Sequence, residues 1–288
     1  MRDKVEEFLR YLKDEKGYSE HTLNAYRNDL NQFIAFWSKK KAPDVPTWTE
    51  VTKEAIIEYI LDLKERSYAL STMARKIAAL RSFFHYLLHQ GAIEDDPTVT
   101  IETPKIPKRA PKILTREQVA RLLEEPAKQG GVKALRDKAI LELLYFTGMK
   151  ASELVSLNVD DVDLASRTVR ILKRKGKERV ISLPPSALEA LRQYLYKGRI
   201  HLVSSDKPSP ALFMNLQGER LTRQGLWVII KHYTETIGIK ERISPSTLRH
   251  SLAVHKLQEG ARLEDIKKLL GHSSAITTLI YSRFVRGG

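Results

Sequence analysis

The 288-residue sequence contains no cysteine, so it has no disulfide framework, no thiolate nucleophile and no zinc site held by cysteine. It also lacks any stretch approaching the ~20 consecutive apolar residues that a membrane-spanning helix needs. Charged residues are spread through residues 1–17, unlike the apolar segment of a signal peptide. Together these absences predict a cytoplasmic protein with no membrane association.

Acidic residues are outnumbered: 49 Lys and Arg stand against 35 Asp and Glu, which gives a net charge of +14. The net charge is −1 over residues 1–100, +3 over residues 101–112 and +12 over residues 113–288. An excess of this size is informative about partners rather than about fold. Nucleic acid is the partner that it favours, and a merely solubilising surface is the alternative.

Residues 1–100 predict four helices that pack as a small bundle. Apolar residues recur there with helical spacing. Residues suited to begin helices are found at Ser19, at Thr52 and at Ser71 or Thr72, and Gly91 is suited to end one. We therefore expect residues 1–100 to form one helical domain.

The fourth predicted helix lies in a stretch, between Arg66 and Ile93, that contains no acidic residue. Its basic side chains are Arg75, Lys76, Arg81, His85 and His89. The last three share one helical face, at positions i, i+4 and i+8. Two interpretations stay open: Arg75, Lys76 and Arg81 contact DNA phosphates, or the helix simply presents a solvated face of the bundle.

Residues 101–112 hold three prolines and four basic residues. The prolines exclude a regular helix, so the segment is predicted to be an extended, semi-rigid linker. Such a linker can run along a duplex, and we expect Lys105, Lys108 and Arg109 to contact DNA from it. The second domain then comprises residues 113–288.

The second domain carries mainly helical patterns. Thr115 and Gln118 have the spacing of a capping box, and the apolar stretch Leu135–Thr147 predicts a buried central helix. Further helical patterns occur at residues 186–196, 221–237, 246–259 and 263–270.

One hairpin is expected among these helices. Runs of β-branched residues at 168–172 and 179–183 flank the basic turn 173–177, which is typical of two antiparallel strands. A short strand is also expected at 211–214. The predicted fold class is mostly α with a small antiparallel sheet (α+β).

The last forty residues contain three side chains suited to phosphate chemistry, Arg249, His272 and Tyr281. Each is a weak signal alone, because a tyrosine near a C-terminus usually packs in a core and Gly-His after a helix usually caps it. Since they lie near the ends of successive short helices, they can converge on one anion.

Two other clusters have simpler interpretations. Asp160, Asp161 and Asp163 are expected to form a solvated turn before the hairpin rather than a metal site. His250 and His255 are expected to pack or to support the site rather than to bind zinc. The sequence therefore predicts no metal site.

At these residues the chain resembles the tyrosine recombinase (phage integrase) family. LRHSLAVHKLQEGA and LLGHSSAITTLIY resemble the family's arginine-containing helix, its Leu-Gly-His motif and its nucleophilic tyrosine. ALRDKAILELLYFTGMKASELVSLNVDDVD resembles its first active-site helix and turn, and KGKERVISL its lysine-bearing hairpin. SEHTLNAYRNDLNQF and STMARKIAALRSFFHYL resemble its helical, SAM-like core-binding domain. The resemblance covers nearly the whole chain and is greatest to the Xer-type members, which resolve chromosome dimers.

The resemblance implies site-specific DNA cleavage and rejoining, without a metal or a cofactor. In this family the tyrosine attacks the scissile phosphate and leaves a 3′-phosphotyrosine and a free 5′-hydroxyl. Tyr281 is the implied nucleophile, and Arg249 and His272 are implied to stabilise the phosphate oxygens. The implied partners are a double-stranded DNA recombination site and further protomers, in a homo- or hetero-tetramer on paired sites.

The family also uses a hairpin lysine as the general acid for the leaving oxygen. Counting back along the strand, the position of the family's lysine falls on Arg174. If the turn is contracted by one residue, the position falls on Lys175 instead. We expect Lys175 to serve, with Lys173 as the second choice. Lys173 and Arg174 are also expected to contact DNA.

Two site positions depart from the family pattern. Lys150 stands where the family has arginine, so the bidentate fork is lost although the charge is kept. Ser246 stands where the family usually has histidine, and a hydroxyl cannot act as a general base near neutral pH. These departures leave an alternative open, a catalytically impaired DNA-binding paralogue or accessory subunit of an active recombinase. Glu153 is expected to orient a basic group of the site.

A third alternative is an RNA-binding or purely structural helical protein. It requires weak DNA binding that is insensitive to salt, because phosphate contacts make DNA affinity strongly salt-dependent.

Overall fold

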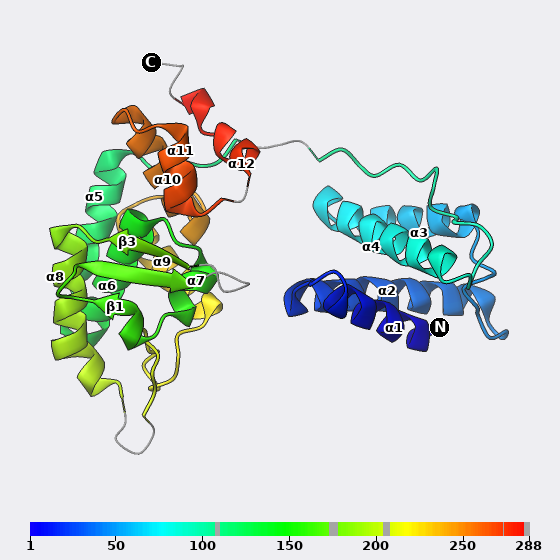
Figure 1. The fold of residues 1–288 in the computed structure, drawn as a ribbon, viewed down its shortest axis with the longest axis horizontal. Coiled ribbons are helices and arrows are strands. Elements are labelled where there is room, and N and C mark those ends of the chain that lie inside the picture. The colour runs from blue at the N-terminus through cyan, green and yellow to red at the C-terminus, as the bar shows by residue number, and fades with distance from the viewer. Residues whose placement is uncertain (107–109, 173–177, 204–207, 273, 285–288) are drawn as a thin grey trace. The chain divides into compact units, whose positions relative to one another are not determined.

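The computed structural model describes residues 1–106, 110–172, 178–203, 208–272 and 274–284 (Figure 1). The chain divides into two compact units, Met1–Arg109 and Ala110–Gly288. The predicted linker, residues 101–112, spans the boundary between these units. The described helices include none that is long and apolar enough to cross a membrane.

The first unit is built from α1 (Arg2–Asp14), α2 (Glu20–Lys41), α3 (Lys53–Glu65) and α4 (Leu70–His89), as Figure 1 shows. The predicted caps of α2 and α3 are confirmed. The Ser19 hydroxyl oxygen accepts a hydrogen bond from the Thr22 N–H at 3.0 Å, and the Thr52 hydroxyl oxygen accepts one from the Ala55 N–H at 3.4 Å. These bonds satisfy N–H groups that have no partner inside a helix.

The predicted cap of α4 at Ser71 or Thr72 is wrong. The helix begins at Leu70, and the preceding Ala69 is the N-cap without a side-chain bond. The main-chain oxygen of Ala69 accepts hydrogen bonds from the N–H groups of Thr72 and Met73. Ser71 and Thr72 therefore lie inside the first turn.

An aromatic cluster forms the core of the first unit. The Trp48 ring lies 4.6 Å from Phe83, 5.6 Å from Phe84 and 5.9 Å from Phe33, measured between centroids. Such ring pairs stabilise a core beyond the area that they bury. Ile101 is buried in the same cluster, so the first residue of the predicted linker belongs to the bundle.

The second unit contains the helices α5 (Arg116–Glu124), α6 (Gly131–Thr147), α7 (Ala151–Ser156), α8 (Pro185–Gln193), α9 (Arg223–Thr236), α10 (Pro245–Gln258), α11 (Leu263–Leu270) and α12 (Ala275–Leu279). Single turns of 3₁₀ or π helix are η1 (Glu125–Lys128), η2 (Val159–Asp161), η4 (Tyr194–Gly198), η5 (Arg199–His201) and η6 (Ser282–Phe284). The capping box of α5 is confirmed, because the Thr115 and Gln118 side chains each accept the other residue's N–H.

A three-stranded antiparallel sheet packs against these helices. Its strands are β1 (Val162–Asp163), β2 (Thr168–Leu172) and β3 (Glu178–Ser182), in the order β1-β2-β3. Val169 pairs with Ile181, and both side chains are buried in the core of the unit. The predicted hairpin and the mostly α fold with a small antiparallel sheet are thus confirmed.

The short strand expected at 211–214 is wrong. Ala211 and Met214 each form one isolated bridge, with Asn158 and Arg220, and these single pairings do not extend into a ladder.

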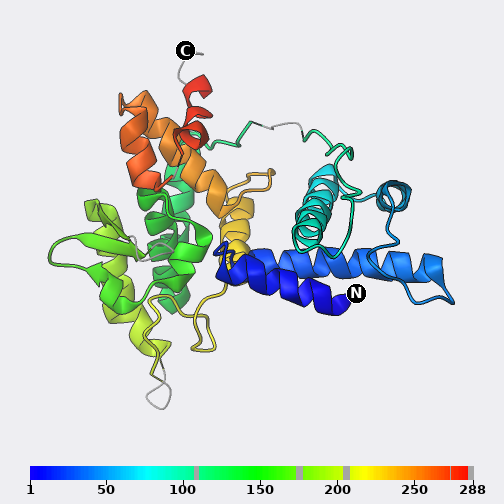
Figure 2. The same cartoon turned by 45° about the vertical axis from the view of Figure 1, so that its right-hand side comes forward.

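Helix α6 runs through the core of the second unit and ends at Gly148. Gly148 has a φ of +57°, in the left-handed region that glycine adopts at helix ends. Its N–H donates to the Leu144 oxygen at 3.1 Å. The chain then turns back through Met149 and Lys150 into α7. In Figure 2, α10, α11 and α12 lie together at one end of this unit.

Candidate active site

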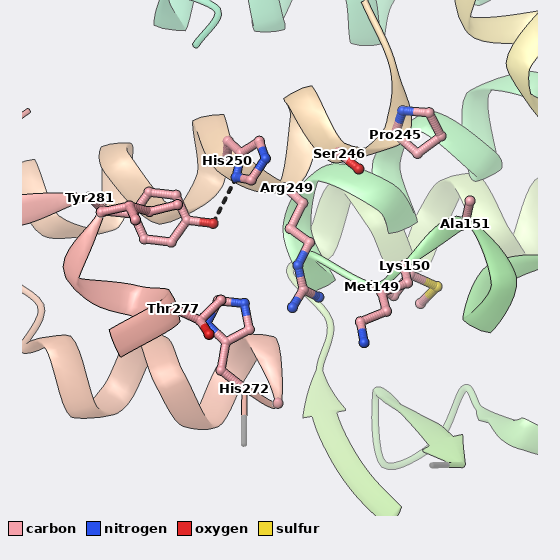
Figure 3. Close-up of a pocket in the computed structure, with 12 residues that line it drawn as sticks. Met149, Lys150, Ala151, Pro245, Ser246, Arg249, His250, His272, Thr277 and Tyr281 are labelled. Atoms are coloured by element: carbon pink, nitrogen blue, oxygen red, sulfur yellow. Dashed lines mark hydrogen bonds between the residues drawn. The ribbon is translucent and has the colours of Figure 1, made fainter. Parts of the chain in front are cut away.

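One pocket of the second unit, about 430 Å³ in volume, gathers residues from four segments. Figure 3 shows them. The turn after α6 contributes Lys150, and the first turns of α10 contribute Ser246, Arg249 and His250. His272 follows α11, and Tyr281 follows α12.

Five of the six residues predicted to be catalytic therefore line one pocket. The sixth, Lys175, lies outside the described residues, as do Lys173 and Arg174.

Arg249 joins the segments that form the pocket. Its Nη1 donates a hydrogen bond to the main-chain oxygen of Gly148, and its Nη2 donates to that of Leu270 at 2.7 Å. The side chain is only 6 % exposed. Because a guanidinium carries five N–H groups, these two bonds leave donors for an anion. Burial lowers the pKa of Arg249 from its ordinary value, but arginine stays charged in proteins.

Tyr281 is buried, with 1 % of its surface exposed, yet it lines the pocket. Its Oη forms a hydrogen bond of 2.7 Å with Nδ1 of His250, drawn as a dashed line in Figure 3. Burial raises the pKa of the Tyr281 phenol, and the positive charge of Arg249 lowers it in part. The phenol is therefore protonated at neutral pH.

His272 lies beside the Tyr281 ring, nearly parallel to it at a centroid distance of 6.5 Å. Its Nδ1 forms a hydrogen bond of 2.9 Å with Oγ1 of Thr278. Burial, with the charges of Arg249 and Lys150, lowers the pKa of His272 to about 4. The imidazole is therefore neutral at pH 7.

An ion pair between the sheet and α7 supports the pocket. Arg179, on β3, donates to both oxygens of Glu153 at 2.9 and 2.7 Å. Glu153 also accepts the Lys150 N–H at 2.8 Å, which fixes the turn that carries Lys150. Although burial raises the pKa of Glu153, the bonds from Arg179 and Lys150 lower it further than burial raises it, so the net shift is downward.

Two groups at this site were not predicted from the sequence. Arg179 was not singled out, and no sequence signal pairs it with Glu153. His250 was expected only to pack or support the site. It lies at i+4 from Ser246 on α10, so helical spacing could have placed it on the pocket face.

The predicted DNA contacts in α4 need a correction. Lys76 is 2 % exposed, and its ammonium donates to Asp29 and Gln32. Because Lys76 is buried and paired with Asp29 of α2, the structure does not present it to a phosphate. Arg75 donates to the same Asp29.

The remaining predicted contacts lie on and beside the linker. Arg81 donates to the main-chain oxygen of Ile101, which ties α4 to the start of the linker. Lys105 is exposed. Lys108 and Arg109 lie outside the described residues.

The acidic and histidine clusters have structural roles. Asp161 accepts the Asn158 N–H at 2.9 Å, and Asp163 accepts the N–H groups of Ala165 and Ser166. Among the residues that the structure describes, no three His, Asp or Glu side chains are placed to hold a metal ion.

His255 holds the start of the second unit. It bonds the Tyr145 hydroxyl at 2.8 Å and the Leu114 oxygen at 3.0 Å. It does not pair with His250, which bonds Tyr281 instead.

The first unit is thus a helical bundle, and the second unit gathers tyrosine, arginine and histidine in one pocket. Residues 112–285 match the phage integrase family, and residues 5–91 match the phage integrase N-terminal SAM-like domain. The chain belongs to the phage integrase family.

Known relatives resemble the chain over nearly its full length. It is 47 % identical to the tyrosine recombinase XerC of Roseiflexus sp. (strain RS-1), over 98 % of this chain and 89 % of that one. It is 37 % identical to the tyrosine recombinase XerD of Oceanobacillus iheyensis, over 98 % and 94 %. The fold is similar to a crystal structure of XerH bound to a palindromic difH substrate in a post-cleavage complex. That similarity has a TM-score of 0.78, 21 % identity, and coverage of 99 % of this chain and 82 % of that chain.

Proposed function

We propose that this chain is a site-specific DNA recombinase of the Xer type, which cleaves and rejoins DNA through Tyr281. The observation that carries the proposal is the meeting of Tyr281, Arg249 and His272 around one pocket, from three separate elements. The curated relatives that match nearly the whole chain are named tyrosine recombinases.

In the proposed reaction Oη of Tyr281 attacks the phosphorus of a backbone phosphate. The Oη–P bond forms as the bond from phosphorus to the 5′-oxygen breaks, which leaves a 3′-phosphotyrosine and a 5′-hydroxyl. The covalent link keeps one phosphodiester-like bond, so attack by a 5′-hydroxyl can reverse the step. Phosphoryl transfer of this kind depends mainly on positioning and on stabilising charge on the phosphate oxygens.

The described residues supply that stabilisation. Arg249 offers its remaining N–H groups in a plane, which suits two phosphate oxygens. Nδ1 of His272 is hydrogen-bonded to the Thr278 hydroxyl, and we propose that the ring carries its proton on Nε2 and donates it to an oxygen in the pocket. Lys150 adds a third positive or donating group at the rim. Lys175 of the hairpin turn is proposed as the acid that protonates the 5′-oxygen.

The proposed partner is double-stranded DNA, and the proposed assembly is a homo- or hetero-tetramer on paired sites. Among proteins of similar fold, XerH is bound to its difH substrate and a lambda integrase dimer is bound to a core site. Lys105, Lys108, Arg109, Lys173 and Arg174 are proposed to contact the DNA backbone. A cytoplasmic location fits a chromosomal substrate.

The test is covalent capture. A DNA site is first selected from random sequence by binding to the full chain, and is then prepared with a nick that lets the cleaved end diffuse away. The chain is expected to form a covalent adduct that the Tyr281→Phe variant does not form. If the wild type forms none but the Lys150→Arg, Ser246→His double variant does, the chain is a DNA-binding accessory subunit instead.

A further inference from the structure

The proposed reaction needs a base for the Tyr281 proton. A phenol ordinarily has a pKa near 10, and burial raises the pKa of Tyr281 above that value. Ser246 lines the pocket, but its hydroxyl cannot take this proton near neutral pH. Another group of this chain must therefore accept the Tyr281 proton. The role inferred below for that group rests on the proposed function.

His250 is the group that meets the reacting atom. Its Nδ1 lies 2.7 Å from Oη of Tyr281, within the range needed for proton transfer (Figure 3). The two rings are 5.6 Å apart between centroids, and both residues line the pocket.

The other titratable groups in and beside the pocket are unsuited to accept the proton. His272 engages its Nδ1 with Thr278 and has a pKa lowered to about 4, so it is a weaker base. Lys150 and Arg249 are cationic. Glu153 is engaged by both Nη groups of Arg179.

His250 is also in the right ionisation state. Burial, with the neighbouring charge of Arg249 on the same helix, lowers its pKa from 6.5. The imidazole is therefore neutral at pH 7 and has a free electron pair. A hydrogen bond accepted by Nδ1 requires the ring proton to be on Nε2.

We propose that His250 is a catalytic residue of this chain, the base that takes the Tyr281 proton during DNA cleavage. The proton moves from Oη to Nδ1 as the Oη–P bond forms and the bond from phosphorus to the 5′-oxygen breaks. The 5′-oxygen takes its own proton from the general acid, for which we propose the hairpin lysine. In rejoining, the His250 imidazolium returns the proton to Oη.

The position of His250 lets it supply the base that the Ser246 hydroxyl cannot provide. The two residues are four apart on α10, so they lie on the same face and both line the pocket. The imidazole is thus supplied one helical turn further along the helix, next to Arg249.

The test compares single-turnover cleavage by the full chain and by His250→Asn, on the same nicked DNA. The asparagine oxygen can replace Nδ1 as a hydrogen-bond acceptor but cannot take a proton. General-base catalysis typically contributes 10²–10⁴-fold, so we expect a loss of about 10²-fold or more. His232→Asn, at an exposed site on α9, is the matched control and should cleave like the wild type.

Three further readouts separate a base from a structural role. The wild-type rate should fall as the pH is lowered through the His250 pKa, and His250→Asn should lose this dependence. Added imidazole should partly restore His250→Ala. A 5′-bridging phosphorothiolate, whose sulfur leaves without a proton, should not rescue His250→Asn.

The outcomes distinguish the two proposals. If the wild type forms a Tyr281 adduct and His250→Asn forms it as fast, with the same pH profile, His250 is not the base although the proposed function stands. If the wild type forms no adduct on the selected site, the proposed function fails, and the role of His250 fails with it.

Discussion

Nη2 of Arg249 donates a hydrogen bond of 2.7 Å to the main-chain oxygen of Leu270, and this bond links α10 to the end of α11. Nη1 of the same side chain bonds Gly148 at the end of α6. The last carbonyls of a helix have no partner within it, so the guanidinium satisfies two helix ends at once. Its plane, and hence the donors left for a phosphate, are fixed before DNA binds.

Replacing Arg249 with lysine should reduce cleavage far more than DNA binding. One ammonium cannot reproduce the planar fork that bonds two carbonyls and an anion. Removing a preorganised donor from a transition state costs on the order of 10²–10³ in rate. Single-turnover cleavage and DNA affinity should be measured on one selected site, and an equal loss in both would contradict this role.

Replacing Lys150 with arginine should increase cleavage. Lys150 lines the pocket and is exposed, so a guanidinium fits there without burial of a new charge. A bidentate contact to phosphate is stronger than a point charge, and we expect about a tenfold gain, about 1.4 kcal/mol. An unchanged or lower rate in Lys150→Arg would show that lysine is already the better residue at this position.

Replacing Gly148 with alanine should both destabilise the second unit and disturb Arg249. An added Cβ would lie 2.6 Å from Leu270 Cδ2 and 2.9 Å from Leu252 Cδ2, in addition to the strain of a positive φ. Such overpacking typically costs about 1–3 kcal/mol.

Gly238→Ala is the matched control, because Gly238 also ends a helix of this unit, α9, with a positive φ, of +80°, and nothing lies within 4 Å of the added Cβ. It carries the backbone strain without the clash. Urea unfolding of both variants should show a greater loss for Gly148→Ala. Equal losses would mean that the side-chain contacts at Gly148 are unimportant.

The half-buried, neutral His272 should make stability depend on pH. Its pKa is about 4 in the fold, against about 6.5 when unfolded. Between these values the unfolded chain binds more protons, so this contribution is fully present above pH 6.5 and is lost as the pH falls towards 4.

We expect the loss to be about 2 kcal/mol after allowing for screening by solvent. Urea unfolding from pH 7 to pH 4 should therefore weaken the wild type more than His272→Asn. His250 and His255, whose pKa values are also lowered in this chain, are present in both proteins, so the difference between the proteins isolates His272. Parallel curves would show that the fold does not lower the pKa of His272.

Replacing Lys76 with methionine should destabilise the bundle without changing the salt dependence of DNA binding. Asp29 would be left buried with only Arg75 as its cationic partner. Breaking a buried pair typically costs 3–5 kcal/mol, and with Arg75 remaining we expect about 2 kcal/mol.

Lys105→Met serves as the comparison, because Lys105 is exposed and is proposed to contact phosphate. Loss of the Lys105 ammonium should reduce the slope of log K for DNA binding against log salt concentration by about one unit. If Lys76→Met reduces the slope as much, Lys76 reaches the DNA after all.

Local signals in the sequence predicted much of the fold. The caps at Ser19 and Thr52 and the capping box at Thr115 depend on side chains within three residues of the groups that they bond. The hairpin likewise follows from two short runs and the turn between them. The start of α4 was missed because Ala69 begins that helix through its main chain, which leaves no side-chain signal.

Contacts between distant residues could not be predicted. Lys76 is buried by Asp29, 47 residues away in the sequence. Arg179 pairs with Glu153 across 26 residues, and His250 bonds Tyr281 across 31. Each pairing depends on how helices and strands pack. The resemblance to a family pointed to the pocket residues, but the position of His250 at Tyr281 required the structure.

The decisive experiment for the proposed function is to identify the protein atom that becomes linked to DNA. The covalent adduct on the selected, nicked site is digested with nuclease and trypsin, and the peptide spanning residues 269–283 is sequenced by mass spectrometry. We expect a phosphonucleotide on Tyr281. A nucleotide on any other residue, or an adduct that survives in Tyr281→Phe, would contradict the proposed function.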